Sequence, residues 1–393
     1  MTRDIVVLDG ARTAIGTFGG TLAGTAPIDT ATHVAKAALE RSGVEGGQIG
    51  HVVFGHVINT EPRDMYLSRV AAIGAGIPDT TPAMNVNRLC GSGAQAIVSC
   101  IQSLALGDAD YALAGGAEAM SRSPHAMQTA RTGQKMGDTK MVDMMIGALN
   151  CPFGTGHMGV TAENVAAEHQ ISRADQDAFA LESQRRAGAA QADGRFDSQI
   201  APFTISTRKG DIVFDKDEHG KPDTSAEDLA RLRPVFQKDG SVTAGNASGI
   251  NDGAAALVLA EAGAAESAGL KPRARVLGYA HAGVRPEVMG LGPIPAVQKL
   301  MERTGLTADD FDVIESNEAF AAQACAVNKG LGFDTAKVNP NGGAIALGHP
   351  IGATGAVITL KCLAELERTG GSKGLVTMCI GGGQGIAIAL ERI

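Results

Sequence analysis

Short apolar runs alternate with amphipathic stretches along this chain, and glycines mark many of the boundaries between them. Ile5–Leu8 is a continuous apolar run of the kind found in buried strands. Pro27–Arg41 has apolar positions at helical spacing, and Gly43 stands where a helix commonly stops. Ala94–Leu106 is apolar almost all round and ends at Gly107, which predicts a helix buried between layers. This alternation indicates a layered α/β fold.

The second half of the chain repeats this order of elements. Ala274–Tyr279 predicts a strand, Ala296–Arg303 a helix, and Ala353–Leu366 another helix that is apolar almost all round. Gly115–Gly116 of the first half matches Gly381–Gly382 of the second. Because two helices without a polar face need layers on both sides, we predict two similar halves packed as a five-layered αβαβα sandwich.

The middle of the chain breaks the repeat. Met120–Met145 is rich in Met and charge, and Ser172 begins a capping-box pattern that predicts a helix near 173–192. We therefore predict an inserted loop domain. The predicted division is residues 1–120 with 250–271 for the first half, 121–249 for the loop domain, and 272–393 for the second half.

Composition narrows the classes of function. A net charge of −8, no Trp and few other aromatic residues oppose binding to nucleic acid or to an anionic membrane. No apolar run is expected to reach the length of a membrane span, and Met1–Asp4 leads into a strand without a signal-peptide pattern. Six cysteines without a C-x-x-C pair suggest neither a disulfide scaffold nor a zinc site. We expect a soluble, cytoplasmic protein without a metal.

Cys90 is the first candidate for chemistry. It lies in a glycine-rich turn before the buried helix, and a helix N-terminus lowers the pKa of a thiol. Gly91 and Gly93 allow the backbone to approach a substrate closely. The alternative is a small buried apolar residue, because most free cysteines are that.

Four further positions lie at the ends of repeated elements. His349 occupies the matching turn of the second half, and a base beside a thiol makes an activated nucleophile. Cys379 follows a strand and precedes Gly381–Gly383, whose N–H groups can stabilise an oxyanion, and Asn317 can hold a water or polarise a carbonyl. Each has an ordinary alternative: a loop His, a core Cys, a tight turn or a helix N-cap. Pseudo-twofold packing of the halves would bring these ends together, which favours a shared site.

Four segments, in this order, resemble the motifs of thiolases: Asn87–Gly93, Asn317–Ala321, Gly342–Ala353 and Cys379–Gly385. Residues 245–253 and 157–159 resemble the coenzyme A and substrate segments of the same family. The resemblance spans essentially the whole chain. It is nearest to biosynthetic acetyl-CoA acetyltransferases and broad-range bacterial β-ketothiolases, and implies the thiolase fold.

The resemblance implies an acetyl-CoA C-acetyltransferase, which condenses an acyl-CoA with acetyl-CoA to a 3-oxoacyl-CoA and free CoA, reversibly. It implies that Cys90 becomes the acyl-enzyme after His349 takes its proton, and that Cys379 removes the α-proton of acetyl-CoA. It also implies two oxyanion sites. One uses His349 and a water held by Asn317, and the other uses the N–H groups of Cys90 and Gly381.

Coenzyme A thioesters are then substrates, and no permanently bound cofactor is expected. The resemblance assigns contacts with coenzyme A or the acyl chain to His157, Met158, Phe236, Ser248, Ala319 and Phe320. It places Lys221 where a cation can meet the nucleotide phosphates, with an ordinary solvated lysine as the alternative. It also implies a homo-oligomer, either a tight dimer or a tetramer joined through the loop domain.

Three other functions compete with this one. A degradative 3-ketoacyl-CoA thiolase of β-oxidation would act on longer chains, but the match over Asn87–Gly93 and the missing presequence favour the biosynthetic type. A β-ketoacyl synthase generally lacks a second reactive Cys such as Cys379. A thiolase-fold carrier of CoA or lipid would not need the three reactive positions. The segment Asn150–Gly156 departs from the family pattern, so the acyl range stays open, as do the physiological direction and the pathway.

Overall fold

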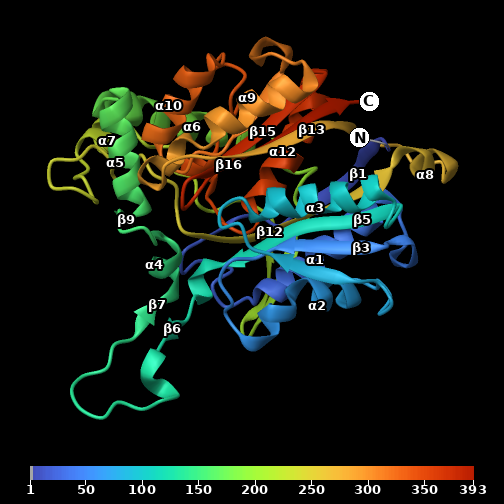
Figure 1. Cartoon of the computed structure of the whole chain (residues 1–393), viewed down its shortest axis with the longest axis horizontal. Helices are drawn as coiled ribbons and strands as arrows, with labels where there is room; N and C mark the ends of the chain where they lie inside the picture. Colours follow the sequence, from blue (N-terminus) through green and yellow to red (C-terminus); the bar gives the residue numbers. More distant parts are fainter. Residues whose placement is uncertain (1–2) are drawn as a thin grey trace.

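Residues 3–393 are described by a computed structural model, in which strands and helices alternate through both halves of the chain (Figure 1). The first half contains β1 (Ile5–Arg12), β2 (Gly16–Thr17), α1 (Pro27–Ser42), β3 (His51–Gly55), α2 (Leu67–Gly74), β4 (Ala83–Val86), α3 (Ser92–Leu106), β5 (Tyr111–Ala119), β12 (Asn251–Glu261) and α8 (Ala262–Ser267). The second half contains β13 (Ala274–Gly283), α9 (Pro293–Thr304), β14 (Val313–Ser316), α10 (Ala321–Leu331), α11 (Ala344–Leu347), α12 (Thr354–Thr369), β15 (Lys373–Ile380) and β16 (Gln384–Arg392).

The main strands form one ten-stranded sheet in the order β14-β15-β16-β13-β1-β12-β5-β3-β4, with β2 paired to β12. The two halves of this sheet meet where Val6 and Val7 of β1 pair with Arg275 and Ala274 of β13. Because the link is so short, the two halves diverge beyond it and enclose helices between them (Figure 1).

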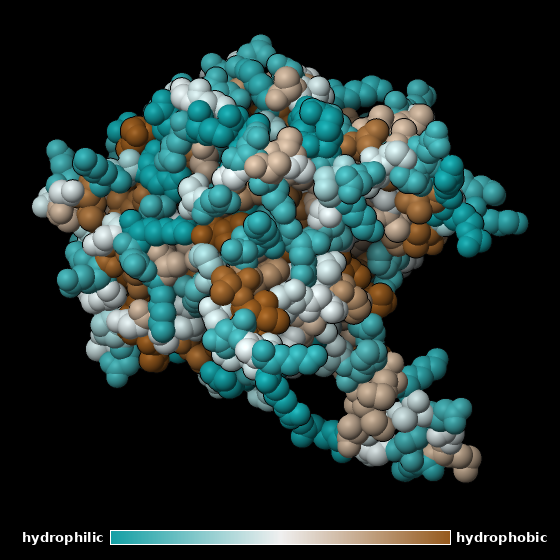
Figure 2. Space-filling view, turned by 180° about the vertical axis from the view of Figure 1, so that it is seen from behind, coloured by the Kyte–Doolittle hydropathy of each residue, from teal (hydrophilic) through white to brown (hydrophobic). Residues whose placement is uncertain are grey.

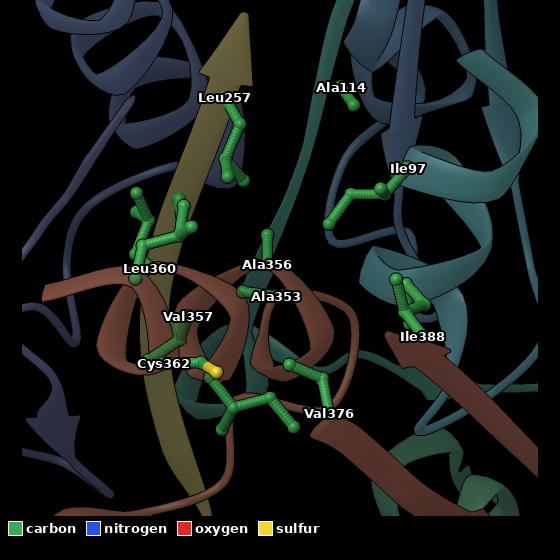
Figure 3. Close-up of a cluster of buried hydrophobic side chains, with 14 of the residues drawn as sticks. Ile97, Ala114, Leu257, Ala353, Ala356, Val357, Leu360, Cys362, Val376 and Ile388 are labelled. Atoms are coloured by element: carbon green, nitrogen blue, oxygen red, sulfur yellow. The ribbon is translucent and has the colours of Figure 1, made fainter. Parts of the chain in front are cut away.

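The layers follow the predicted αβαβα order. Helices α3 and α12 pack on each other between the half-sheets, α1 and α2 cover the outer face of the first, and α9 and α10 cover that of the second. Figure 3 shows part of this central cluster, in which Ile97 of α3 and Leu360 of α12 are buried together with Leu257 of β12 and Ile388 of β16. The five-layered prediction is confirmed.

Among the described residues, Leu89–Leu106 is the one helical segment whose length and apolar composition would suit a membrane span. The expectation that no apolar run reaches this length is therefore wrong. The prediction that this helix is buried between layers is right, because α3 packs against α12 and both half-sheets.

Strand registers show which positions of the two halves correspond. A pseudo-twofold axis at the β1–β13 pairs relates the two halves. It superposes β12 on β16 and β5 on β15. The bulges after Val7 and Val276 align the two ladders, and counting outward from them places Ala117 of β5, the residue before Glu118, at the position that Cys379 occupies in β15. Continuing to β3 and β14 places Gly55, the residue before His56, at the position of Asn317.

The sequence match of Gly115–Gly116 with Gly381–Gly382 is therefore wrong by several positions, because Gly116 corresponds to Met378. The two glycine pairs serve different physical needs. A Cβ added at Gly116 would lie 2.8 Å from the Cα of Ala353, so this glycine permits close approach of the second half. Gly382 has a φ of 83°, which a turn requires.

Between β5 and β12 the chain leaves the main sheet. This segment contains β6 (His125–Ala126), β7 (Val142–Asp143), α4 (Met144–Ala148), β8 (Asn150–Cys151), β9 (Gly156–His157), α5 (Met158–His169), α6 (Arg173–Ala192), β10 (Phe203–Thr207), β11 (Gly210–Phe214) and α7 (Ala226–Ala230). The predicted capping box of Ser172 is present at the start of α6. An arm that includes β6 and β7 projects from the body (Figures 1 and 2). The predicted domain division stays a prediction, and its first two residues, Met1 and Thr2, lie outside the described part.

Candidate active site

A cavity of about 260 Å³ lies between the two halves and the inserted segment. Ten residues predicted from sequence line it: Cys90, His157, Met158, Phe236, Ser248, Ala319, Phe320, His349, Cys379 and Gly381. They come from loops and from the ends of strands and helices that are far apart in sequence. The fold thus brings together the ends of the repeated elements in one small cavity.

Cys90 lies in the turn between β4 and α3. The preceding residue, Leu89, has a φ of 44°, a left-handed conformation that is uncommon for a non-glycine residue. Cys90 is half-buried and packs against an apolar cluster that includes Met120 and Ile351. A Cβ added at Gly93 would lie 2.9 Å from the backbone N of Ala356, so this glycine lets α3 approach α12.

The two thiols line the same cavity but have different surroundings. The pKa of Cys90 is raised by burial, and the N–H of Gly381 opposes this by donating a hydrogen bond to the sulfur. Burial also raises the pKa of Cys379, and the neighbouring Cys90 raises it further. Both groups are therefore neutral thiols in the resting protein, and neither becomes a thiolate without a base.

His349 lies in the loop before α12 and is 5% exposed. Its backbone N–H donates to Oδ1 of Asn251 (2.9 Å). Nδ1 lies 2.7 Å from Oγ1 of Thr354, and Nε2 lies 3.4 Å from Nδ2 of Asn317. Burial lowers the pKa of His349 to about 4, so its ring is neutral at neutral pH and has a lone pair to accept a proton.

Asn317 stands behind His349 and does not line the cavity. It follows β14 directly, and its backbone N–H donates to the carbonyl of Thr377 (3.0 Å), which fixes its position. Its side-chain Oδ1 is buried and has no hydrogen-bond partner among the described residues. A buried acceptor of this kind is stabilised by a donor, so the amide can hold a polar group near His349.

Three rings form an aromatic slot along one wall. His157 stacks on Phe236, with ring centroids 4.7 Å apart and planes 14° apart. Phe236 meets Phe320 edge to face at 6.2 Å. Burial lowers the pKa of His157, so this ring is also neutral. The slot suits an uncharged, extended chain better than a phosphate.

Lys221 does not line this cavity. It borders a neighbouring one of about 250 Å³, together with His219 and Leu232. The loop Ala244–Ile250 lies between the two, because its first residues line one cavity and its later residues line the other. The predicted cation is thus placed beside the reactive cavity.

Sequence reasoning did not single out ten further residues of the cavity wall: Leu89, Met120, Ile146, Ala148, Leu149, Ala247, Gly249, Ile250, Met289 and Ile351. Five of these lie inside the segments that resemble thiolase motifs, so those segments could have identified them as residues of the cavity wall. Met120 and Met289 are isolated methionines with no local pattern.

A larger surface cavity of about 740 Å³ lies between α6 and α10, and none of the ten predicted residues lines it. Within residues 3–393, no group of three or more His, Cys, Asp or Glu side chains is arranged to hold a metal ion.

Comparison with known proteins gives two family matches. The N-terminal domain of thiolases matches residues 5–263, and the C-terminal domain of thiolases matches residues 270–392. A beta-ketothiolase, BktB, from Cupriavidus necator is 61% identical over the full length of both chains. An acetyl-CoA acetyltransferase from Chromobacterium violaceum is 50% identical over 99% of this chain and all of its own.

Solved structures show the same fold. Human mitochondrial 3-ketoacyl-CoA thiolase is similar with a TM-score of 0.98 and 42% identity, covering 100% of each chain. The acetyl-CoA acetyltransferase of Bacillus anthracis is similar with a TM-score of 0.98 and 45% identity, covering 100% of this chain and 99% of its own.

Proposed function

The chain belongs to the thiolase family, and from this premise we propose that its acyltransferase chemistry runs through Cys90, His349 and Cys379. One observation carries the proposal. Two thiols and a neutral imidazole, from two loops and the end of strand β15, line one cavity of about 260 Å³. This is the arrangement that an acyl-enzyme mechanism with a second, basic thiol needs.

In the first half-reaction, His349 takes the proton of Cys90, and the Cys90 sulfur attacks the acyl-CoA carbonyl. The C–S bond to coenzyme A breaks, and the departing CoA sulfur takes the proton of Cys379. The products are free CoA, an acyl group on Cys90, a protonated His349 and a Cys379 thiolate. The Gly381 N–H that points at Cys90 supports this step, because it can stabilise the oxygen anion of the tetrahedral intermediate.

In the second half-reaction, the Cys379 thiolate removes the α-proton of acetyl-CoA. A thiol with a raised pKa is a strong base once ionised, which suits this weakly acidic C–H. The carbanion attacks the acyl group on Cys90, releasing 3-oxoacyl-CoA. The Cys90 sulfur then recovers its proton from His349. During this step, protonated His349 and the group held by Asn317 face the enolate oxygen.

We propose that coenzyme A lies across both cavities. Its uncharged pantetheine chain would follow the slot of His157, Phe236 and Phe320, and would pass Met158, Ser248 and Ala319. Its nucleotide would reach the neighbouring cavity, where Lys221 can meet the phosphates. No resident cofactor takes part in this scheme.

The proposed reaction is the synthesis and cleavage of short 3-oxoacyl-CoA. The small cavity volume and the names of the relatives, beta-ketothiolase and acetyl-CoA acetyltransferase, support it. A series of 3-ketoacyl-CoA esters of increasing length tests this. Much faster cleavage of long chains than of acetoacetyl-CoA would overturn the short-chain proposal and favour β-oxidation.

Mass spectrometry after mixing with acetyl-CoA tests the acyl-enzyme. We expect an acetyl adduct on Cys90 that is absent in Cys90→Ala. Cys100→Ala is a matched control, because Cys100 is buried inside α3 and does not line the cavity. No adduct on any residue of the native protein would overturn covalent catalysis and favour a carrier.

We also propose a homo-oligomer in the cytoplasm. Strand β4 is an edge of the sheet, and Met65, Tyr66 and Met84 near it are exposed apolar side chains. The projecting arm exposes Met136 and Met141, which supports a second contact that would make a tetramer (Figure 2).

All six cysteines are free thiols, as in a reducing compartment. Light scattering and cell fractionation test these proposals.

A further inference from the structure

Thr354, the first residue of α12, touches the proposed base directly. Its Oγ1 lies 2.7 Å from Nδ1 of His349 and 2.9 Å from the carbonyl oxygen of Pro350. Thr354 is 2% exposed, so water does not compete for either hydrogen bond. A buried hydroxyl between a ring nitrogen and a carbonyl has few ways to arrange its one proton.

The chemistry of the neighbours selects one arrangement. The Pro350 carbonyl can only accept, so the Thr354 hydroxyl donates to it and has lone pairs left to accept N–H from Nδ1 of His349. On the other side of the ring, Nδ2 of Asn317 can only donate, so Nε2 must accept. The same tautomer, with its hydrogen on Nδ1, satisfies both neighbours.

We propose that Thr354 is a positioning residue that fixes His349 in the tautomer with hydrogen on Nδ1, leaving Nε2 as the basic nitrogen. This inference rests on the proposed roles of Cys90 and His349. In the other tautomer, the lone pair would face Thr354 and could not receive the proton of Cys90. After the transfer, Nε2–H becomes a donor for the substrate oxygen while Nδ1–H stays with Thr354.

A hydroxyl in this place differs from the carboxylate of a Ser-His-Asp triad. A carboxylate orients the ring and also stabilises the imidazolium. Thr354 orients the ring without adding charge, so protonated His349 readily returns its proton to Cys90 at the end of the cycle. Thr354 thus sets the orientation of the His349 ring without raising its proton affinity.

Three variants test the proposal. Thr354→Val keeps the shape but removes the hydroxyl, and Thr354→Ser restores the hydroxyl. Thr359→Val is a matched control, because Thr359 is also buried in α12 and does not contact His349. Its Oγ1 also donates to a carbonyl four residues earlier, that of Gly355, at 2.7 Å. We expect Thr354→Val to lower kcat by about 10–100-fold, as for other partners that orient a catalytic His, with KM little changed. We expect Thr354→Ser and Thr359→Val to keep most of the activity.

Nitrogen-15 NMR of the resting, labelled enzyme reads the tautomer without turnover, with His349→Asn to assign the signals. We expect a protonated Nδ1 and a bare Nε2 in the native protein and in Thr354→Ser, and a mixture in Thr354→Val. A native ring protonated on Nε2 would overturn the proposal, as would equal losses of kcat in Thr354→Val and Thr359→Val. Failure of Cys90 to acylate would instead contradict the proposed function, and the NMR result would stand apart from it.

Discussion

The two halves of this thiolase place opposite kinds of residue at the same position of a repeated fold. At the end of β15, Cys379 lines the reactive cavity, and Asn317 directly follows the neighbouring strand, β14. In the first half, the corresponding positions hold Ala117 and Gly55, which have no reactive side chain, and neither they nor the residues that follow them, Glu118 and His56, line that cavity. The repeat therefore supplies two equivalent sites, of which one has reactive groups.

Glu118, at the same strand end of the first half, has a structural task instead. The Glu118 carboxylate accepts the N–H of Gly352 (3.0 Å), three residues after His349, and also those of Val57 (3.1 Å) and Ile58 (3.2 Å). Glu118 thus ties the loop of His349 to the opposite half. Burial raises the pKa of Glu118 to about 6, and the nearby His56 and the three N–H groups act against this rise.

This difference between the two strand ends shows how a fold made of two similar halves can contain an asymmetric site. In the proposed mechanism, groups at one copy of this strand end react, while Glu118 at the other copy holds a loop that the reaction needs. Substitutions at the two strand ends should therefore fail in different ways, the second-half ones in rate and the first-half one in stability.

The largest effect is expected for Cys379→Ala. Loss of a general base typically costs about 10²–10⁴-fold, and this loss should fall on condensation. Acetylation of Cys90 should lose much less, because the attacking sulfur and His349 are unaltered and the CoA sulfur can leave as a thiolate without the proton of Cys379. Rapid-quench mass spectrometry of the acetyl adduct, compared with the steady-state rate of condensation, separates the half-reactions. Equal losses in both would show that the roles of the two thiols are assigned wrongly.

A smaller loss of rate is expected for Asn317→Ala. Removing one donor from an oxyanion site costs about 10²–10³-fold in kcat. The contact with Nε2 of His349 is 3.4 Å, so the ring would also lose a neighbour. Measured kcat for condensation checks this, and the control is His56→Ala, the residue after Gly55 at the equivalent first-half position. If His56→Ala slowed condensation as much, the asymmetry of the two copies would be refuted.

Much of this arrangement was predictable because it depends on local sequence. Helix α1 follows from its apolar spacing and Gly43, and α6 from its capping box. The register between halves was not predictable. Gly116 is needed for close approach and Gly382 for a left-handed turn, but both are glycine pairs in sequence. The placement of Asn317 behind His349, and of Lys221 in a second cavity, depends on long-range packing, which leaves no local pattern.

Glu118→Ala is expected to reduce stability more than rate. The change leaves three N–H groups without their acceptor, two of them buried, and one buried group of this kind costs about 1–3 kcal/mol. Since relief of the buried charge offsets part of this, we expect a net loss of about 3 kcal/mol in the free energy of unfolding. Urea unfolding measures the loss of stability. The kcat is measured at urea concentrations below the unfolding transition. There, loosening of the His349 loop should lower kcat by about tenfold at most. Unchanged stability with a collapse of kcat would place Glu118 in the chemistry and remove the contrast with Cys379.

The smallest effect is expected in the pH dependence of the free energy of unfolding, and it comes from His349, the proposed base. The pKa of His349 is about 4 in the folded protein against 6.5 ordinarily. As pH falls from 6.5 toward 4, the unfolded chain binds a proton that the folded chain does not, so His349 lowers stability across this window. His349→Asn removes this term and keeps a donor for Thr354. Relative to the native protein, the variant should therefore gain about 2 kcal/mol on going from about pH 7.5 to about pH 5. Urea unfolding at the two pH values measures the change, and differences in other groups cancel between the two proteins. A variant that gained nothing would mean that His349 titrates normally, and that the second half holds its base in contact with water.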